Sequence, residues 1–166
     1  LHASVVALAV ALGCGGGSQQ TSAPAPAGAP PAPPMEWFTD RAQESGIDFT
    51  HVNGATGKFY YPEILPPGVA LFDFDNDGDL DVYLVQGHPL EPGTRPDPSL
   101  RGRLYRNDLE VRADGTRTLH FTDVTARAGI AGQARGMGCL AADFDEDGRM
   151  DLLVANDVQP NALWRN

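Results

Sequence analysis

One stretch of this chain constrains its fold more than any other: an acidic loop enclosed by two apolar runs. Residues 68–86 read Gly-Val-Ala-Leu-Phe-Asp-Phe-Asp-Asn-Asp-Gly-Asp-Leu-Asp-Val-Tyr-Leu-Val-Gln. Five carboxylates within nine residues of this stretch repel one another at neutral pH, so the loop becomes compact only when a positive charge lies among them. Aspartates at alternate positions, with a glycine that permits a sharp turn at position 6, form the oxygen-rich cage that Ca²⁺ prefers. The stretch therefore predicts a calcium loop.

The expected ligands of this loop are four carboxylates and one main-chain carbonyl. They are Asp73, Asp75, Asp77 and Asp81 through their side chains and Asp79 through its carbonyl oxygen. The spacing also fits the start of an EF-hand, which needs a bidentate glutamate at position 12 and a helix on each side. Position 12 is Leu84, and β-forming residues flank the loop. We therefore expect the loop to join two strands, with EF-hand-like helices and a merely acidic turn as the alternatives.

A second loop with the same spacing of acidic residues lies within residues 138–156. Its expected ligands are Asp143, Asp145, Asp147 and Asp151 through their side chains and Arg149 through its carbonyl oxygen. Position 12 is again apolar, at Val154. Two loops with matching flanks indicate an internal repeat rather than a chance match.

Further matches on either side of the loops define the repeat. Phe-Thr-Asp at 38–40, followed by Gly-Ile at 46–47, recurs at 121–123 and 129–130. After the loops, Leu-Tyr-Arg-Asn at 104–107 recurs as Leu-Trp-Arg-Asn at 163–166. The separation between counterparts falls along the unit, which places insertions within 48–67 and 87–102 of its first copy. Both insertions are rich in glycine, proline, asparagine, histidine and aromatic residues, so we expect surface loops on one rim.

Without its insertions the repeat is about 59 residues long, which suits a propeller blade or a similar β-repeat. Strands are expected near 68–72, 81–86, 103–107, 119–124, 138–142, 150–155 and 162–166. Short helical turns are expected over 39–45 and 123–128, because each begins near an aspartate that can cap it and ends at a glycine. Aromatic residues at recurring places are expected in the core: Phe38, Phe72, Tyr105, Phe121, Phe144 and Trp164. The expected fold is all-β, a partial β-propeller of about two blades after a disordered N-terminal tail.

Residues 1–35 differ in composition from the repeats. Residues 1–14 carry an apolar stretch that is too short to span a bilayer and fits the core of a signal peptide. We expect Cys14 to be the lipidated first residue of a mature lipoprotein, with a plain secretory signal or a buried apolar strand as the alternatives. Residues 15–35 are rich in Gly, Ser, Ala and Pro and are expected to form a semi-stiff linker. Residues 36–166 then hold two repeats, 36–120 and a truncated 121–166.

The net charge of −10 is concentrated in the two acidic loops, which together hold −9 of it. The acidity therefore indicates cation sites rather than disorder. Nucleic acid is not an expected partner, because 12 basic residues without a basic run face 22 acidic ones. Cys139 lies among small residues and is expected to be a buried small hydrophobe rather than a nucleophile.

The motifs of residues 36–166 resemble those of one known family. The stretch 68–81, Leu-Tyr-Arg-Asn, the decapeptide Phe-Thr-Asp-Val-Thr-Ala-Arg-Ala-Gly-Ile and Phe-Thr-His-Val-Asn-Gly are similar to FG-GAP/VCBS-type repeats of cartilage acidic protein and UnbV-like proteins. The resemblance implies an extracytoplasmic, integrin-like, calcium-bearing β-propeller followed by a C-terminal domain outside residues 1–166. Pro66-Pro67 stand where small residues are expected before Gly68, which is a departure from the pattern.

Three functions are compatible with these features. We expect a non-enzymatic module, lipid-anchored in the bacterial outer membrane, periplasm or cell surface or else secreted, whose Ca²⁺ loops rigidify a propeller that presents its insertions to a protein or glycan. It would meet the membrane through its N-terminal lipid only. The rival is a propeller-based hydrolase or lyase that uses His51, His88 and His120, although no known catalytic motif pairs them. The third is a structural repeat of a larger assembly. Since two blades cannot close a ring, the remaining blades of a longer chain are also expected partners.

Overall fold

The computed structural model describes residues 36–65, 67–94, 97–130, 132 and 134–166. The chain divides into two units, residues 1–38 and 39–166, and every helix and strand of the described residues belongs to the second. The predicted signal peptide, Cys14 and the linker of 15–35 lie outside the described residues. Within the described ranges no helical segment reaches the length and hydrophobicity that crossing a bilayer requires.

The first acidic loop belongs to a four-stranded antiparallel sheet. In spatial order its strands are β1 (Val69–Phe72), β2 (Asp81–Leu84), β3 (Arg103–Asn107) and β6 (Phe121–Asp123). Residues of β1 alternate between the two faces of this sheet, so that Ala70 and Phe72 are buried whereas Val69 and Leu71 are exposed. This sheet therefore has one face that is already covered and a second face that is partly open.

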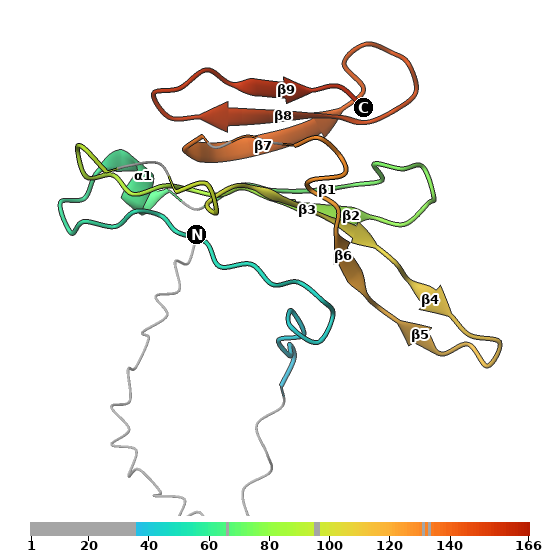
Figure 1. Ribbon diagram of the computed structural model, residues 1–166. Helices are drawn as coiled ribbons and strands as arrows, with labels where there is room; N and C mark the ends of the chain where they lie inside the picture. Colours follow the sequence, from blue (N-terminus) through green and yellow to red (C-terminus); the bar gives the residue numbers. More distant parts are fainter. Residues whose placement is uncertain (1–35, 66, 95–96, 131, 133) are drawn as a thin grey trace, which may run out of the picture. The chain divides into compact units, whose positions relative to one another are not determined.

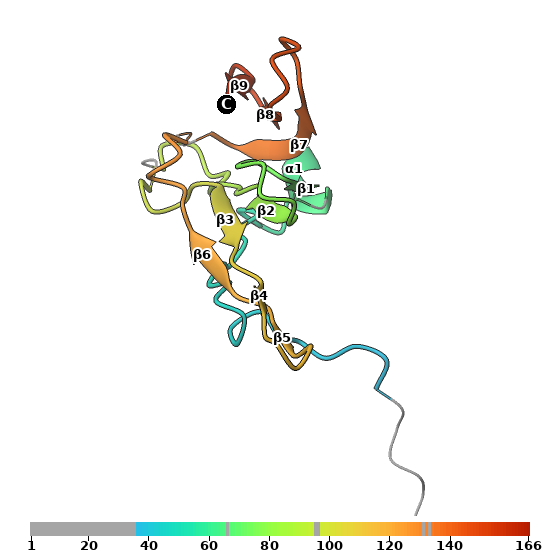
Figure 2. The same ribbon diagram turned by 90° about the vertical axis from the view of Figure 1, so that its right-hand side faces the viewer.

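The second acidic loop belongs to a three-stranded antiparallel sheet. Its strands are β7 (Gly136–Ala142), β8 (Asp151–Asn156) and β9 (Ala162–Trp164). The two sheets pack against each other with β1 next to β7, which both Figure 1 and Figure 2 show. All seven predicted strands form, with ends that shift by at most two residues. The predicted all-β fold with two blade-like sheets, a partial propeller, is confirmed.

Two short elements were not expected from the sequence. The hairpin of β4 (Glu110–Val111) and β5 (Arg117–Thr118) interrupts the connection from β3 to β6. Its turn contains Asp114-Gly115, with a φ of 83° at Gly115, which is a hairpin signal that the sequence carries. The single helical turn α1 (Tyr61–Ile64) lies in the first insertion. Both elements are too short for a hydrophobic periodicity to reveal them.

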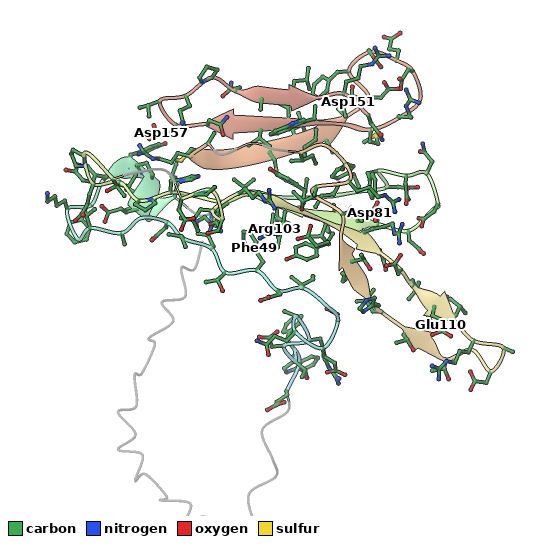
Figure 3. The ribbon with its side chains drawn as sticks, viewed as in Figure 1. Phe49, Asp81, Arg103, Glu110, Asp151 and Asp157 are labelled. Carbon is green, nitrogen blue, oxygen red and sulfur yellow. The ribbon has the colours of Figure 1, made fainter. Side chains whose placement is uncertain are left out.

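The main core lies between the two sheets. Its buried members are Ala70, Phe72, Tyr83, Val85 and Leu104 from the first blade, Leu152 and Val154 from the second, and Val124 and Ile130 from the connection between them. A smaller cluster lies on the other face of the first sheet, where Ile47 and Phe49 pack against Val82, Tyr105 and Phe121 (Figure 3). The first sheet is thus covered by the second sheet on one face and by the segment before it on part of the other.

The same three backbone hydrogen bonds recur at matching positions of the two predicted repeats. In the first repeat, main-chain N–H groups donate to carbonyl oxygens from Ser45 to Arg41 (2.8 Å), Gly46 to Gln43 (3.1 Å) and Ile47 to Ala42 (2.9 Å). In the second repeat, the matching bonds run from Ala128 to Val124 (2.8 Å), Gly129 to Ala126 (3.3 Å) and Ile130 to Thr125 (3.2 Å). The carboxylates of Asp40 and Asp123 cap these turns by accepting main-chain N–H groups at 3.0 and 2.9 Å. The helical turns predicted after 39 and 123 therefore exist as single turns.

The prediction that all six recurring aromatic residues are core is wrong for two of them. Phe72, Tyr105 and Phe121 are buried and Trp164 packs against the core, but Phe38 and Phe144 are exposed. Phe74, the counterpart of Phe144 in the first loop, packs against the core between the sheets. No element of the described residues covers Phe144 in the same way. The counterpart of Phe38 is Phe121, which pairs with Asn107 in β3, whereas residues 38–40 pair with no strand of the described ranges.

Candidate metal centres

Each acidic loop connects two neighbouring antiparallel strands, β1 to β2 and β7 to β8. The two loops lie at the same end of their sheets, on the right in Figure 1. The loops turn sharply at Gly78 and Gly148, whose φ values of 93° and 88° are accessible to glycine at little cost. Since strands flank both loops, the strand-loop-strand prediction is confirmed and the EF-hand alternative does not apply.

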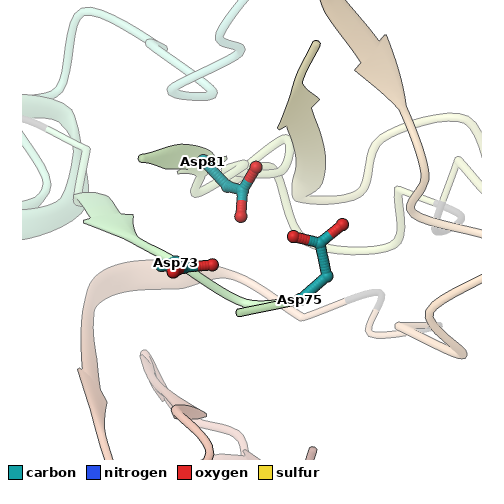
Figure 4. A group of neighbouring side chains, drawn as sticks. All are labelled: Asp73, Asp75 and Asp81. Atoms are coloured by element: carbon teal, nitrogen blue, oxygen red, sulfur yellow. The ribbon is translucent and has the colours of Figure 1, made fainter. Parts of the chain in front are cut away.

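The first loop brings three carboxylates together. Asp73, Asp75 and Asp81 each offer one oxygen, and these oxygens lie within 4.8 Å of one another, with the side chains turned towards a common space (Figure 4). Asp73 also holds the turn, because its Oδ1 accepts the Asp77 N–H at 3.1 Å and its Oδ2 accepts the Gly78 N–H at 2.9 Å. A carboxylate oxygen has two lone pairs, so Asp73 retains the capacity to bind a cation.

Asp81 is the fully buried member of this group, with 0% of its surface exposed. Its Oδ2 accepts the Phe74 N–H at 2.8 Å, and its Oδ1 accepts the Asn107 N–H at the end of β3, also at 2.8 Å. One side chain at the start of β2 therefore fastens the acidic loop to the neighbouring strand (Figure 3). Burial without these donors would be costly for a carboxylate.

The second loop repeats this geometry bond for bond. Oxygens of Asp143, Asp145 and Asp151 again lie within 4.8 Å of one another. The matching hydrogen bonds run from the N–H of Asp147 to Asp143 Oδ1 (3.1 Å), Gly148 to Asp143 Oδ2 (2.8 Å), Phe144 to Asp151 Oδ2 (3.1 Å) and Asn166 to Asp151 Oδ1 (2.9 Å). The two acidic loops belong to different sheets and yet bring their carboxylates together in the same geometry. The spacing of the aspartates within each loop therefore determines this geometry.

The protonation equilibria of the first group reflect crowded negative charge. Burial, followed by the nearby charges of Asp77 and Asp73, raises the pKa of Asp75, and Arg106 offsets this only in part. Burial also raises the pKa of Asp81, although two main-chain N–H donors oppose the change. A raised carboxyl pKa means that the fold disfavours the ionised form of these groups. A divalent cation between them would reverse that preference.

Two of the predicted ligands in each loop lie outside the three-carboxylate groups. Asp77 Oδ1 accepts the Asp79 N–H at 2.9 Å, and Asp147 Oδ1 accepts the Arg149 N–H at 3.0 Å. The main-chain N–H of Arg149 is the largest cause that lowers the pKa of Asp147, and the Arg149 side chain adds to it. Side-chain coordination by Asp77 and Asp147, and carbonyl coordination by Asp79 and Arg149, stay predictions.

The repeated Arg-Asn pair adds site residues that the sequence reasoning missed. Arg165 forms ion pairs with Asp145 and, at 3.4 Å, with Asp147. Its counterpart Arg106 instead pairs with Asp108 at 2.7 Å. The recurrence of Leu-Tyr-Arg-Asn as Leu-Trp-Arg-Asn was the available signal for these roles. Arg165 therefore forms an ion pair with one of the three carboxylates of the second group, whereas Arg106 acts on the first group only from a distance.

Replacing Arg165 by glutamine is expected to raise the calcium affinity of the second site about threefold, because an exposed ion pair is worth well under about 1.4 kcal/mol. The matched change Arg106→Gln is expected to alter the first site less, since Arg106 is engaged by Asp108. Calcium titration of each variant, with the other loop silenced by Asp75→Asn or Asp145→Asn, measures the two sites separately. A lower affinity after Arg165→Gln would show that the arginine supports coordination rather than competing with it.

The donor set fits a hard divalent cation. Both groups consist of carboxylate oxygens alone, and Ca²⁺ takes six to eight oxygen ligands at flexible geometry. Three carboxylates supply up to six oxygens, and loop carbonyls or waters can complete the shell. Within the described ranges neither group contains a nitrogen or sulfur donor, which zinc or copper would favour. The residues present therefore suit Ca²⁺.

The histidines proposed for the enzymatic alternative lie in different settings. His51 Nδ1 is 3.2 Å from the Val85 carbonyl oxygen and lines an open groove, of which neither His88 nor His120 is a lining residue. His88 is buried, and desolvation lowers its pKa. The Cys139 thiol is half-buried, and burial raises its pKa to about 11, as expected for a small core residue.

Residues 73–154 match the family model of the FG-GAP-like repeat. The matched segment starts at the first aspartate of the first loop and ends in β8, so it contains both three-carboxylate groups. Neither curated proteins nor solved structures give a match to the chain. The segment that carries both candidate metal centres is therefore similar to the FG-GAP-like repeat.

Proposed function

We propose that the chain is a calcium-binding repeat module in which each acidic loop holds one Ca²⁺ ion. The observation that supports this most strongly is that two loops bring three carboxylates each within 4.8 Å of one another through the same hydrogen bonds. When bound, the ion supplies the positive charge that offsets mutual repulsion of these carboxylates. Asp73, Asp75 and Asp81 hold it in the first loop, and Asp143, Asp145 and Asp151 in the second.

The role of the cation in this proposal is to fix the end of each sheet. Asp81 accepts the N–H of Asn107 at the end of β3, and Asp151 accepts the N–H of Asn166 just after β9. A cation held by either aspartate therefore links the two strands beside its loop to the third strand of the same sheet. The cation thereby stabilises the folded state by linkage, since the unfolded chain has no preformed site. Extracellular sites of this kind have dissociation constants on the order of 10⁻⁴ to 10⁻³ M.

The partner in this proposal is a protein or a glycan that binds the two insertions of the first blade. Gln86, the residue directly before the second insertion, fastens the first insertion, because its side chain accepts the Val52 N–H at 2.8 Å and donates to the Thr50 carbonyl at 2.9 Å. Between them lies an open groove of about 570 Å³, a size typical of ligand sites, lined by residues 51–56, 89–91 and 94. Its lining includes five polar side chains that can bind a hydrogen-bonding ligand: His51, Asn53, Thr56, Glu91 and Thr94.

The resemblance to cartilage acidic protein and UnbV-like proteins supports an extracytoplasmic setting. In that setting Cys14 carries a lipid that is the only contact with the membrane, residues 15–35 act as a spacer, and further blades of a longer chain complete the propeller. Millimolar calcium outside the cell would keep sites of this affinity filled. A hydrolase or lyase acting through His51 remains the alternative, and it would need a second acid or base beside His51 in the groove.

Calcium at about 10 mM is expected to raise the free energy of unfolding by about 1.4 to 2.7 kcal/mol per site, which corresponds to a concentration about 10 to 100 times the dissociation constant. Urea unfolding with calcium and with EDTA measures this increment. Asp75→Asn and Asp145→Asn should each remove the increment of one site, about half of the total, and the double variant should remove the whole increment. Asp114→Asn, which removes a carboxylate at the hairpin tip, is the control. An increment that survives in the double variant would rule out these loops as the sites.

A further inference from the structure

The two insertions of the first blade lie at one end of its sheet. The first leads into the start of β1, and the second connects the end of β2 to the start of β3. The acidic loop joins the other ends of β1 and β2, so the insertions lie on the left in Figure 1 and the acidic loops on the right. Further blades pack on the faces of the sheets, so the arrangement in the proposed function leaves this end open.

Three consecutive aromatic side chains are exposed on the first insertion. Phe59, Tyr60 and Tyr61 are 80%, 42% and 66% exposed. Exposed aromatic side chains that lie together are typical of binding sites. Phe59 has a φ of 58°, a left-handed conformation that a bulky residue adopts only at a cost in free energy. Since its ring is mostly exposed, packing within the chain does not offset this cost, and the ring is free to contact a ligand.

One carboxylate holds these aromatic residues beside the groove between the insertions. Glu63 Oε1 accepts the Thr56 hydroxyl at 2.7 Å and the Tyr60 N–H at 3.4 Å. Its Oε2 accepts the Gly57 N–H at 3.2 Å. These hydrogen bonds, above all that of the Thr56 hydroxyl, lower the pKa of Glu63, so the carboxylate stays ionised and keeps its donors. Because Thr56 lines the groove, the aromatic residues are fastened to its wall before a ligand arrives.

The arrangement of polar and apolar groups selects the class of ligand. Five of the ten residues that line the groove carry polar side chains, whereas the three aromatic residues lie outside the lining. A protein interface normally has the reverse order, with an apolar centre and a polar rim. A sugar carries C–H groups on the faces of its ring and hydroxyl groups around its edge. One chain of sugars can therefore stack on aromatic rings and also form hydrogen bonds within a polar groove.

The charge of the groove favours a neutral sugar chain. Glu91 lines the groove, and the described lining residues include no lysine or arginine. A carboxylate accepts hydrogen bonds from hydroxyl groups, and such bonds are stronger than those between neutral groups. The same carboxylate repels an acidic sugar.

We propose that this site binds a neutral glycan, whose sugar rings stack on the aromatic side chains of residues 59–61 and whose hydroxyl groups bind the polar side chains of the groove. The inference rests on the proposed function for the place of the partner, and it narrows the partner from a protein or a glycan to a glycan. The calcium loops lie at the opposite end of the sheets, so they take no direct part in the contact.

Removal of one aromatic ring is expected to weaken glycan binding about three- to tenfold. Tyr61→Ala removes a ring, and Tyr61→Phe, which keeps it, should retain most of the affinity. Phe59→Gly removes a ring where the φ of 58° suits glycine, so it should weaken binding with little change in the melting temperature. Phe38→Ala, which removes an exposed ring outside the insertions, is the matched control and should bind as the unmodified chain does.

Glu91→Ala tests the groove independently of the rings. A hydrogen bond to a charged group is worth more than one between neutral groups, so this variant is expected to weaken binding at least about tenfold. Glu110→Ala removes an exposed carboxylate from the hairpin strand β4 and is the matched control. Equal affinity of Glu91→Ala and Glu110→Ala would contradict the placement of sugar hydroxyl groups in the groove.

Chemical-shift titration of the ¹⁵N-labelled full chain in calcium measures binding of three probes. These are the β-linked hexasaccharides of glucose, mannose and galactose, each raised to about 10 mM so that weak binding is detected. At least one probe is expected to shift signals of residues 51–61 and 89–94 and to leave those of the acidic loops unchanged. Absence of binding for all three probes would overturn the proposal, as would equal affinity of the unmodified chain, Tyr61→Ala and Phe59→Gly.

Calcium uptake by the same samples separates failure of the glycan site from failure of the calcium sites. A chain that takes up two Ca²⁺ ions but no hexasaccharide would contradict the glycan alone and leave a protein as the partner. A chain that binds a hexasaccharide but no Ca²⁺ would support the glycan and contradict the calcium sites alone.

Discussion

Asp81→Ala is expected to lower the free energy of unfolding by about 3 kcal/mol even without calcium, because it leaves two partly buried N–H donors without an acceptor, at a cost of about 1 to 3 kcal/mol each. Those donors are the N–H groups of Phe74 and Asn107, both 2.8 Å from the carboxylate. In calcium the loss is expected to grow, since the first site disappears while the second remains. Urea unfolding in EDTA and in calcium measures both effects.

The matched variant Asp81→Asn separates the hydrogen bonds from the charge. Asparagine keeps one acceptor and removes a buried negative charge, so in EDTA its stability should fall within about 1 kcal/mol of the unmodified chain. In calcium it should lose the increment of the first site just as alanine does. Equal behaviour of the two variants in EDTA would show that the N–H groups find other partners. A full calcium increment in Asp81→Asn would remove Asp81 from the set of ligands.

Gly68→Ala is the second change with a large expected effect, a loss of about 2 kcal/mol. Its Cβ would meet main-chain atoms of the second sheet, 2.7 Å from the Gly138 Cα and 2.9 Å from the Cys139 N. Backbone cannot rotate away as a flexible side chain can, so the two sheets must separate. Thermal unfolding of dilute protein measures the loss.

Gly138→Ala is the control for this prediction, because it adds the same methyl group to the other glycine of this close approach at a place where the methyl group meets no other atom. Its Cβ has no atom within 4 Å in the chain, so the stability of a dilute sample should change by no more than about 0.5 kcal/mol. Equal losses for Gly68→Ala and Gly138→Ala would mean that the cost reflects strand propensity rather than the packing of the two sheets.

The parts of this molecule that could be predicted from sequence are those that local spacing determines. The alternate aspartates bring three carboxylates together in each loop because the turn at Gly78 or Gly148 is set within the same few residues. The strands follow for the same reason, since apolar runs enter and leave each loop. The two capped turns were also predictable, because Asp40 and Asp123 lie directly before them.

The parts that could not be predicted depend on residues far apart in the chain. Asn107 donates to Asp81 across 26 positions, and only the pairing of β2 with β3 brings them together. Arg106 and Arg165 occupy matching places, yet only Arg165 turns to the acidic loop, because Asp108 competes for Arg106. The exposure of Phe144 has the same kind of cause. Its surroundings depend on whether another sheet lies over the second blade, which no local pattern reveals.

The central claim is that each acidic loop holds one calcium ion, and the stoichiometry of calcium binding tests it most directly. Isothermal titration of the full chain is expected to give two ions per chain. Asp75→Asn and Asp145→Asn should each reduce this number to one, and the double variant should take up none. Two ions bound by the double variant, or no calcium uptake by the unmodified chain, would contradict the account.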